Sequence, residues 1–247
     1  NIAYPDGEKA VVLRAFFPWA QQVKAVYGDK QSEIGMNKIS TEGLFECVFK
    51  ENPESFAYHF RVIPLNGEPY EVTDPYSFDP IISDFDLQIW GEGNHQEAYK
   101  FMGAHYKTVH GVEGTHFVVS APSSPRVSVI GPFNSWDGRV HPMRKHHDQG
   151  IWELFIPGIK PGDIYKYEVQ TPFNEPPNKK ADPFAFYSEM RPNTASVVYD
   201  LKPIEWEDEE WVNSRYEKQH FDGPISVYEV HLGSWRRKEN NEFLQNS

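Results

Sequence analysis

The sequence contains one pattern twice, at an offset of 107 positions. The stretch GLFECVF at 43–49 matches GIWELFI at 150–156 in the kind of residue at every position. The same offset aligns YHFRV at 58–62 with YKYEV at 165–169. Self-similarity at a fixed offset indicates a duplicated structural unit. The chain is therefore expected to hold two copies of one module of roughly a hundred residues.

Each copy has the pattern of a β-rich module. Short runs of β-branched and aromatic residues, such as RVSVI at 126–130 and IYKYEV at 164–169, are separated by clusters of Gly, Pro, Asn and Asp. That spacing is typical of a β-sandwich. Aromatic residues make up 15% of the chain, which is enough to build a sizeable core. We expect an all-β fold of two tandem immunoglobulin-like sandwiches.

The run IYKYEV alternates in polarity. Tyr165, Tyr167 and Val169 are expected to face the core, because successive side chains of a strand point to opposite faces of its sheet. Lys166 and Glu168 are then expected to project from the solvent-facing side.

The second copy carries a turn-rich stretch without a counterpart in the first, FNSWDG at 133–138. Turn-forming residues surround Trp136, which either closes the edge of the sandwich or is displayed to a ligand. An indole stacks well on the C–H face of a sugar ring. Asn134 could bond the hydroxyl groups, with the strand lysine Lys166 nearby. The residues alone leave both interpretations open.

Composition excludes several classes of protein. The net charge of −12 argues against a nucleic-acid partner, because phosphates would be repelled. A run of some 20 apolar residues is absent, so no membrane span is expected. The first residues lack the basic and apolar regions of a signal peptide. The single cysteine, Cys47, lies in an apolar run and is expected in the core. These features favour a cytoplasmic protein.

Motifs of known catalytic chemistry are absent from the sequence. It contains no Gly-rich phosphate loop and no GxSxG, HExxH or CxxC motif. The histidine-rich stretch HPMRKHHD at 141–148 does not have the ligand spacing of a zinc site. We therefore predict no catalytic residue, no metal site and no cofactor in this chain.

At this point a family resemblance becomes visible. The stretch from Gly111 to Arg144, which includes FNSWDG, resembles the glycogen-binding module (carbohydrate-binding family 48) of α-1,4-glucan branching enzymes. Other stretches resemble further parts of the bacterial members: VVLRAFFPWAQQVKAV, SDFDLQIWGEG, RPNTASVVYDL, EWEDEEW and ISVYEVHLGSWRR. The first two are similar to the extra N-terminal sandwich of the longer members. The last is similar to the first strand of the catalytic (β/α)₈ barrel.

The resemblance implies where a glucan would bind. Trp136 matches the aromatic residue that stacks on glucose in related modules, and Lys166 matches the basic residue beside it. The second stacking tryptophan of those modules has no counterpart in TPFNEPPNKKADP at 171–183. The first copy lacks FNSWDG, and its Trp19 is expected to pack.

The resemblance also implies a domain organisation. The expected parts are an N-terminal sandwich (1–80), a linker with a short helix at 95–102 (81–104), the family 48 sandwich (105–200), a connector (201–223) and the truncated start of the barrel (224–247). In the connector, Trp206 and Trp211 are expected to pack on neighbouring domains. Residues 224–247 are expected to be poorly packed or to borrow contacts from another molecule, because a lone barrel strand lacks neighbours.

The implied function is to bind and position α-1,4-glucan or glycogen for a catalytic barrel in the full-length protein. Family members cut α-1,4 linkages and transfer the chain to form α-1,6 branches. The barrel carries the catalytic residues, so this chain alone is expected to be inactive. Two alternatives stay open: a stand-alone glucan-binding protein, and an immunoglobulin-like interaction domain with a structural Trp136.

Overall fold

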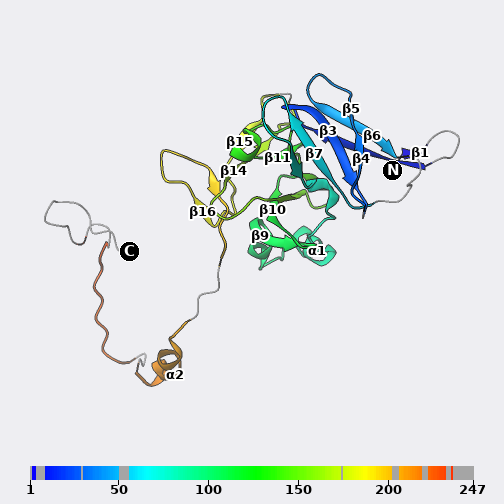
Figure 1. The fold of residues 1–247 in the computed structure, drawn as a ribbon. Coiled ribbons are helices and arrows are strands. Elements are labelled where there is room, and N and C mark those ends of the chain that lie inside the picture. The colour runs from blue at the N-terminus through cyan, green and yellow to red at the C-terminus, as the bar shows by residue number, and fades with distance from the viewer. Residues whose placement is uncertain are drawn as a thin grey trace. The chain divides into compact units, whose positions relative to one another are not determined.

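The computed structural model describes residues 2–3, 9–28, 30–49, 56–173, 175–201, 206–218, 222–231 and 235. The chain forms two units, Asn1–Leu201 and Lys202–Ser247. All the strands of the described residues lie in the first unit (Figure 1).

The first module is a sandwich of two antiparallel sheets. One sheet has the order β1-β2-β6-β5 and the other β4-β3-β7-β8. The strands are β1 (Ile2–Ala3), β2 (Lys9–Phe16), β3 (Ala20–Tyr27), β4 (Ser32–Gly35), β5 (Asn37–Lys38), β6 (Leu44–Phe49), β7 (Tyr58–Pro64) and β8 (Tyr70–Val72). Apolar side chains from both sheets, including Leu13, Val23, Phe45 and Phe60, form one core between them. Cys47 lies in that core, as its apolar surroundings predicted.

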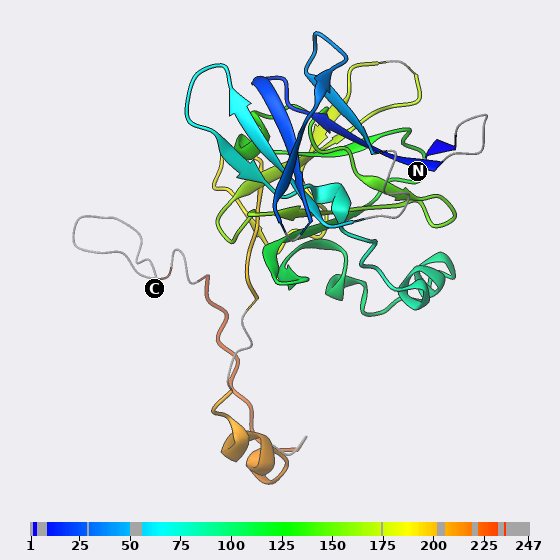
Figure 2. The same cartoon turned by 45° about the vertical axis from the view of Figure 1, so that its right-hand side comes forward.

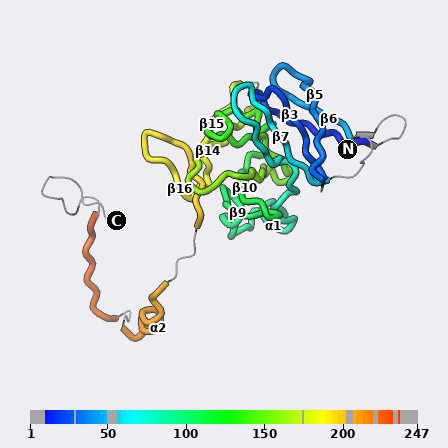
Figure 3. The backbone as a smooth tube through the Cα atoms, in the orientation of Figure 1, coloured from blue at the N-terminus to red at the C-terminus, as the bar shows by residue number. Residues whose placement is uncertain are grey.

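The second module is also a sandwich. Its sheets have the orders β12-β13-β10-β9 and β11-β14-β17-β16, with β15 paired to β14. The strands are β9 (Gly103–Val109), β10 (Val112–Ser120), β11 (Val127–Ile130), β12 (Arg144–His146), β13 (Ile151–Pro157), β14 (Ile164–Val169), β15 (Asn178–Lys180), β16 (Tyr187–Ser188) and β17 (Ser196–Val197). Phe117, Trp152, Tyr165 and Tyr167 are among the residues buried between the sheets. Figure 3 traces the chain from the blue and cyan first sandwich to the green and yellow second one.

The repeat in the sequence corresponds to a repeat in the fold. Strand β6 pairs with β2 as β13 pairs with β10, and β7 pairs with β3 as β14 pairs with β11. A buried contact is repeated as well. The Tyr58 hydroxyl donates to Asp74 Oδ2 at 2.5 Å, and the Tyr165 hydroxyl donates to Asp182 Oδ2 at 2.6 Å. The all-β prediction of two sandwiches is confirmed.

The segment between the sandwiches differs from the predicted one. The helix is α1 (Asp84–Gly91), not 95–102, where only a 3-10 turn, η2 (Ala98–Lys100), forms. Ser83 caps α1 by accepting from the Asp86 backbone N–H at 3.1 Å, and acidic residues in the first turn complement the helix dipole.

This segment covers the outer face of the β10–β13 sheet. Leu87, Phe101 and Met102 pack there against Val118 and Ile151. Figure 2 shows the segment lying outside the strands of the second sandwich. The position of the helix thus depends on a tertiary contact as well as on its cap.

The second unit contains α2 (Glu209–Lys218). Trp206 and Trp211 are more than half exposed, and their packing on neighbouring domains stays a prediction. Residues 225–231 form no strand, and the apolar side chains of Ile225 and Val227 are exposed. The prediction of a barrel strand concerns these residues and others outside the described part of the chain. No helix among the described residues is long and apolar enough to cross a membrane.

Candidate functional site

The candidate site is built on residues 131–138, here called the Trp136 loop. It follows β11 and begins with a 3-10 turn, η3 (Pro132–Asn134). Ser135 and Trp136 have φ angles of 54° and 60°, in the left-handed region that non-glycine residues rarely adopt. The Trp136 backbone N–H donates to Gly131 O at 2.9 Å and closes the turn. Two such residues in succession persist only when the surroundings fix them.

The side chain of Asn134 helps to hold Ser135 and Trp136 in this conformation. Its side chain is 2% exposed, and its Oδ1 accepts from the Gly131 backbone N–H at 3.0 Å. Its Nδ2 donates to Val129 O and to His141 Nδ1, both at 2.9 Å. The structure therefore places the Asn134 amide inside the loop, against three protein groups, rather than on its surface.

His141 is a neutral partner in this contact. Burial lowers the pKa of His141 to about 4, so its ring is uncharged at neutral pH and its Nδ1 can accept. The tilted ring of Phe133 lies next to it, with the ring centroids 5.8 Å apart. The base of the Trp136 loop is thus a small, closed hydrogen-bond network.

Trp136 itself is partly buried, and its indole N–H makes no hydrogen bond within the described part of the chain. Trp19 of the first sandwich is different. Its indole N–H donates to the Tyr70 hydroxyl at 2.5 Å, and its ring packs edge to face on Phe17. Trp19 therefore packs with one edge while 37% of it stays exposed, and it differs from Trp136 in that its indole N–H has a partner.

The loop folds over the outer face of the β11–β14 sheet. Gly138 lies so close to the Glu168 carboxylate that a Cβ at this position would overlap it. Glu168 is only 8% exposed and accepts from Arg126 Nη2 at 2.8 Å. The predicted alternation of β14 is confirmed, because Tyr165 and Tyr167 lie in the core. However, the loop covers Glu168, which the sequence had placed in solvent.

Lys166 lies at the foot of the Trp136 loop. It pairs across the sheet with Ile130, the residue directly before the loop. Its Nζ donates to Thr194 Oγ1 at 2.7 Å, and its side chain is partly buried. The strand register thus brings Lys166 to the end of the sheet where the loop begins.

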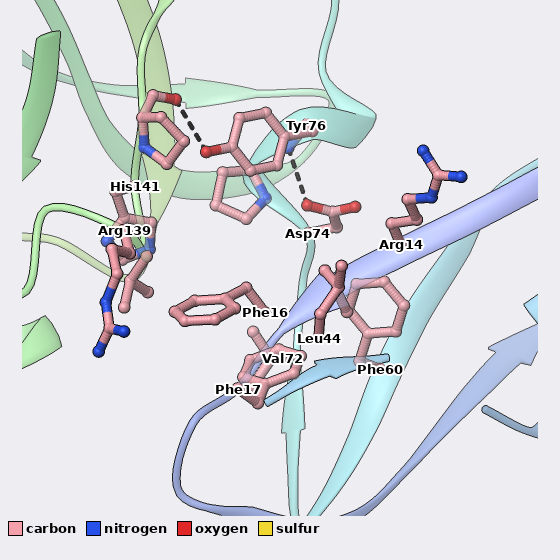
Figure 4. A pocket seen from close by; sticks show the side chains of 14 residues that line it. Arg14, Phe16, Phe17, Leu44, Phe60, Val72, Asp74, Tyr76, Arg139 and His141 are labelled. Atoms are coloured by element: carbon pink, nitrogen blue, oxygen red, sulfur yellow. Dashed lines mark hydrogen bonds between the residues drawn. The ribbon is translucent and has the colours of Figure 1, made fainter. Parts of the chain in front are cut away.

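The residues that directly follow the loop, 139–142, reach the first sandwich. A cavity of about 180 Å³ lies between residues 139–142 and that sandwich (Figure 4). On one side of it the Tyr76 hydroxyl donates to Pro142 O at 2.8 Å. On the other, the Arg139 guanidinium lies over the Phe16 ring, 5.3 Å from its centroid.

Sequence reasoning missed some exposed aromatic residues. The stretch 171–183 lacks a tryptophan but contains Phe173, whose side chain is 80% exposed in the loop after β14. Tyr187 of β16 and Tyr199 beyond β17 are also about half exposed. The signal for Phe173 was an aromatic residue among turn formers, the same signal that pointed to Trp136.

A second cluster of polar side chains surrounds Glu153 and has a structural role. Glu153 is 2% exposed and lies between His116 and His146, with Nε2 atoms 2.7 and 2.5 Å from its oxygens. It also accepts from the Ile81 backbone N–H at 3.0 Å. Burial would raise the pKa of Glu153, but its bonds to His116, Ile81 and His146 lower it to about 2. This carboxylate fastens the linker to the second sandwich.

The two sandwiches match two family models. Residues 101–185 match carbohydrate-binding module 48, the isoamylase N-terminal domain. Residues 5–76 match the N-terminal domain of the alpha-1,4-glucan branching enzyme GlgB. The fold and the matches together describe two β-sandwiches, the first similar to the GlgB N-terminal domain and the second, which carries the Trp136 loop, similar to carbohydrate-binding module 48.

Similar full-length proteins extend this result. The 1,4-alpha-glucan branching enzyme GlgB of Rubrobacter xylanophilus is 42% identical over 233 residues, which cover 94% of this chain and 32% of the relative. That of Roseobacter denitrificans is 44% identical over 228 residues, covering 91% and 31%. Over more than nine-tenths of its length, the chain is similar to the N-terminal region of 1,4-alpha-glucan branching enzymes. It spans about a third of the length of these curated relatives.

Among solved structures, the chain aligns with the pullulanase of Anoxybacillus sp. LM18-11 complexed with maltotetraose. The alignment covers 92% of this chain and 28% of the pullulanase, with 16% identity and a TM-score of 0.35.

Proposed function

We propose that this chain binds α-1,4-glucan, such as glycogen, on the Trp136 loop and orients it for a catalytic barrel in the full-length enzyme. The proposal rests on one observation, the position and hydrogen bonding of Trp136. Its ring stands on a turn held rigid by Asn134, and its indole N–H has no hydrogen-bond partner in the described residues. A rigid aromatic surface with a free polar end suits a sugar ring and its hydroxyl groups.

The roles of the three predicted residues follow from their surroundings. Trp136 stacks on a glucose ring, and the Lys166 ammonium bonds a sugar hydroxyl from the foot of the loop. Asn134 acts indirectly, by holding the turn. Phe173 offers a further exposed ring on the loop after β14. We place this activity in the cytoplasm, which agrees with the single, unpaired Cys47.

The proposal is tested by retardation in native gels that contain glycogen. Stacking on one ring contributes about 1–3 kcal/mol by analogy with bases, so Trp136→Ala should weaken binding about 5- to 150-fold. Trp206→Ala is the matched control, because it removes an exposed tryptophan of the other unit. Circular dichroism of the variants verifies that the sandwiches remain folded.

Each outcome separates the candidate functions. Retardation that Trp136→Ala loses and Trp206→Ala keeps supports glucan binding on the loop. Equal mobility of all variants, with and without glycogen, would refute the proposal and favour an interaction domain with a structural tryptophan. A branching assay on this chain alone is expected to show no activity, because the family's chemistry resides in the barrel.

A further inference from the structure

The sheet face that carries Lys166 extends to two exposed tyrosines. In the pairing of β14 with β17, Ile164 lies opposite Val197. In the pairing of β17 with β16, Val197 lies opposite Tyr187. Directly opposed residues share a face, and so do residues two apart on one strand, such as Ile164 and Lys166 of β14. Tyr187 therefore lies on the face of Lys166, in β16 at the edge of the sheet.

The opposite face of the same strands belongs to the core. Tyr165 lies opposite Ser196, and both are fully buried. The assignment of faces is therefore fixed by burial as well as by register. Tyr187 points away from the core and is 52% exposed.

Tyr187 forms a pair with Tyr199. Their ring centroids are 5.6 Å apart, with an angle of 31° between the ring planes, and Tyr199 is 48% exposed. Neither hydroxyl group makes a hydrogen bond within the described part of the chain. Two large rings with free hydroxyl groups thus form a ledge at the sheet edge, here called the tyrosine pair.

The loop between β16 and β17 connects the tyrosine pair with Lys166. Glu189 accepts from the Ala195 backbone N–H at 3.0 Å and, through its own backbone N–H, donates to Ala195 O at 3.0 Å. Thr194 of the same loop accepts from Lys166 Nζ. These bonds close the loop at its base and connect β16 and β17, next to the tyrosine pair, with Lys166.

We propose that the tyrosine pair is a second stacking surface for α-glucan, reached by the same glucan chain that binds Trp136 and Lys166. This inference rests on the proposed function. Two strand spacings of about 4.8 Å separate β14 from β16, so the pair lies roughly 10 Å across the sheet from Lys166. An oligosaccharide of a few glucose units spans that distance.

The chemistry of the pair favours a neutral sugar polymer. Aromatic faces with hydroxyl groups offer stacking and hydrogen bonding without a charge. The chain has a net charge of −12, which disfavours an anionic ligand such as a phosphate-bearing surface. Because the pair shares a sheet face with Lys166, at the foot of the Trp136 loop, we infer that one extended glucan chain contacts all of them.

The experiment compares two ligands of different length. Binding of maltotriose and maltoheptaose to the whole chain is measured by calorimetry for the variant Tyr187→Ala/Tyr199→Ala. We expect its affinity for maltoheptaose to fall about tenfold, because one of two linked stacking sites is lost. Its affinity for maltotriose, which Trp136 holds alone, should stay unchanged.

Two further variants control for structure. Tyr99→Ala removes a tyrosine of similar exposure, 54%, from the turn η2 and should leave both affinities unchanged. Tyr187→Phe/Tyr199→Phe keeps the stacking rings and should retain most of the maltoheptaose affinity. If Ala at both positions disturbs folding, the Phe variant and its single Ala counterparts still test the ring.

The results distinguish this inference from the proposed function. Unchanged maltoheptaose affinity in the double Ala variant would overturn the inference, while a loss in Trp136→Ala would leave the proposed function standing. A loss only in the tyrosine variant would move the glucan site to the tyrosine pair and overturn both the role of Trp136 and its link to the pair. No loss in either variant would refute both.

Discussion

Arg139 donates through Nη1 to Glu42 Oε2 at 2.8 Å and so joins two residues that are 97 positions apart in the chain. The same guanidinium donates to both carboxylate oxygens of Asp137, at 2.8–3.2 Å, directly beside Trp136. This bond from Arg139 is the main cause of the lowered pKa of Asp137. The first sandwich is therefore attached to the loop that carries the candidate stacking residue. This bond links the two sandwiches next to Trp136.

Removing that contact should loosen the loop more than it destabilises the fold. Arg139→Ala is expected to speed amide hydrogen exchange at Trp136 and Asp137 and to weaken glycogen retardation. The free energy of unfolding should change little, because exposed ion pairs contribute little to it. Arg14→Ala is the control, since it removes a similar exposed pair with Glu46 inside the first sandwich. Equal exchange at Trp136 in both variants would contradict the proposed attachment.

Gly138 should not tolerate a side chain. The variant Gly138→Ala forces either the loop or the Glu168 carboxylate to move, and Glu168 is held by Arg126. We expect a loss of about 1–3 kcal/mol in the free energy of unfolding, together with weaker glycogen binding. Urea unfolding measures the first effect. Gly35→Ala serves as the comparison, because a Cβ at Gly35 meets no atom within 4 Å; a similar loss there would remove the steric explanation.

Acid should weaken the Trp136 loop through His141. The folded pKa of His141, about 4, lies below its ordinary value near 6.5. The unfolded chain therefore binds more protons between these values, and stability falls as the pH drops from about 6.5 towards 4. The loss from this group reaches up to about 3 kcal/mol. Protonation would also end the acceptance of the Asn134 N–H by Nδ1.

Urea midpoints between pH 7 and pH 4 test this prediction. His141→Gln should make the decline shallower, and part of it should remain because burial also lowers the pKa of His116. Replacement of the exposed His147 by Gln should leave the wild-type decline unchanged. A decline that is the same in all three proteins would assign the acid sensitivity to other groups.

The duplicated tyrosine–aspartate contact should stabilise both sandwiches. Tyr165→Phe removes the hydroxyl that donates to the buried Asp182, and Tyr58→Phe removes the equivalent donor to Asp74. A hydrogen bond to a charged group contributes about 1.5–3 kcal/mol, and we expect losses of that size in each variant. Unfolding of the exposed-residue variant Tyr99→Phe gives the baseline. If only one of the two variants loses stability, the contact is duplicated in geometry but not in function.

Much of the fold could be predicted from local patterns. The strand pairs of both sandwiches follow the repeated runs GLFECVF/GIWELFI and YHFRV/YKYEV, because alternation and turn residues act over a few positions. The helix was misplaced although Ser83 and two acidic residues marked its start at Asp84. The helix was predicted at HQEAYKFM instead, where Ala98 and Phe101 turn towards the second sandwich.

The candidate site was predicted only in outline. FNSWDG pointed to Trp136, and strand alternation put Lys166 on the outer face. Neither could reveal that Asn134 is turned inward or that Glu168 lies under Gly138. Those positions depend on how a loop folds back on a sheet, which no nearby residue specifies.

By itself, the sequence determined the duplication, the β-sandwich class, the family resemblance and the identity of the turn that carries Trp136. These properties are written in residue type and short-range spacing. Only the tertiary structure decided the attachment of Arg139 to Glu42, the burial of Glu168 and the shared face of Lys166 and Tyr187. Each of these joins residues from separate parts of the chain, and such contacts arise from packing that local patterns do not encode.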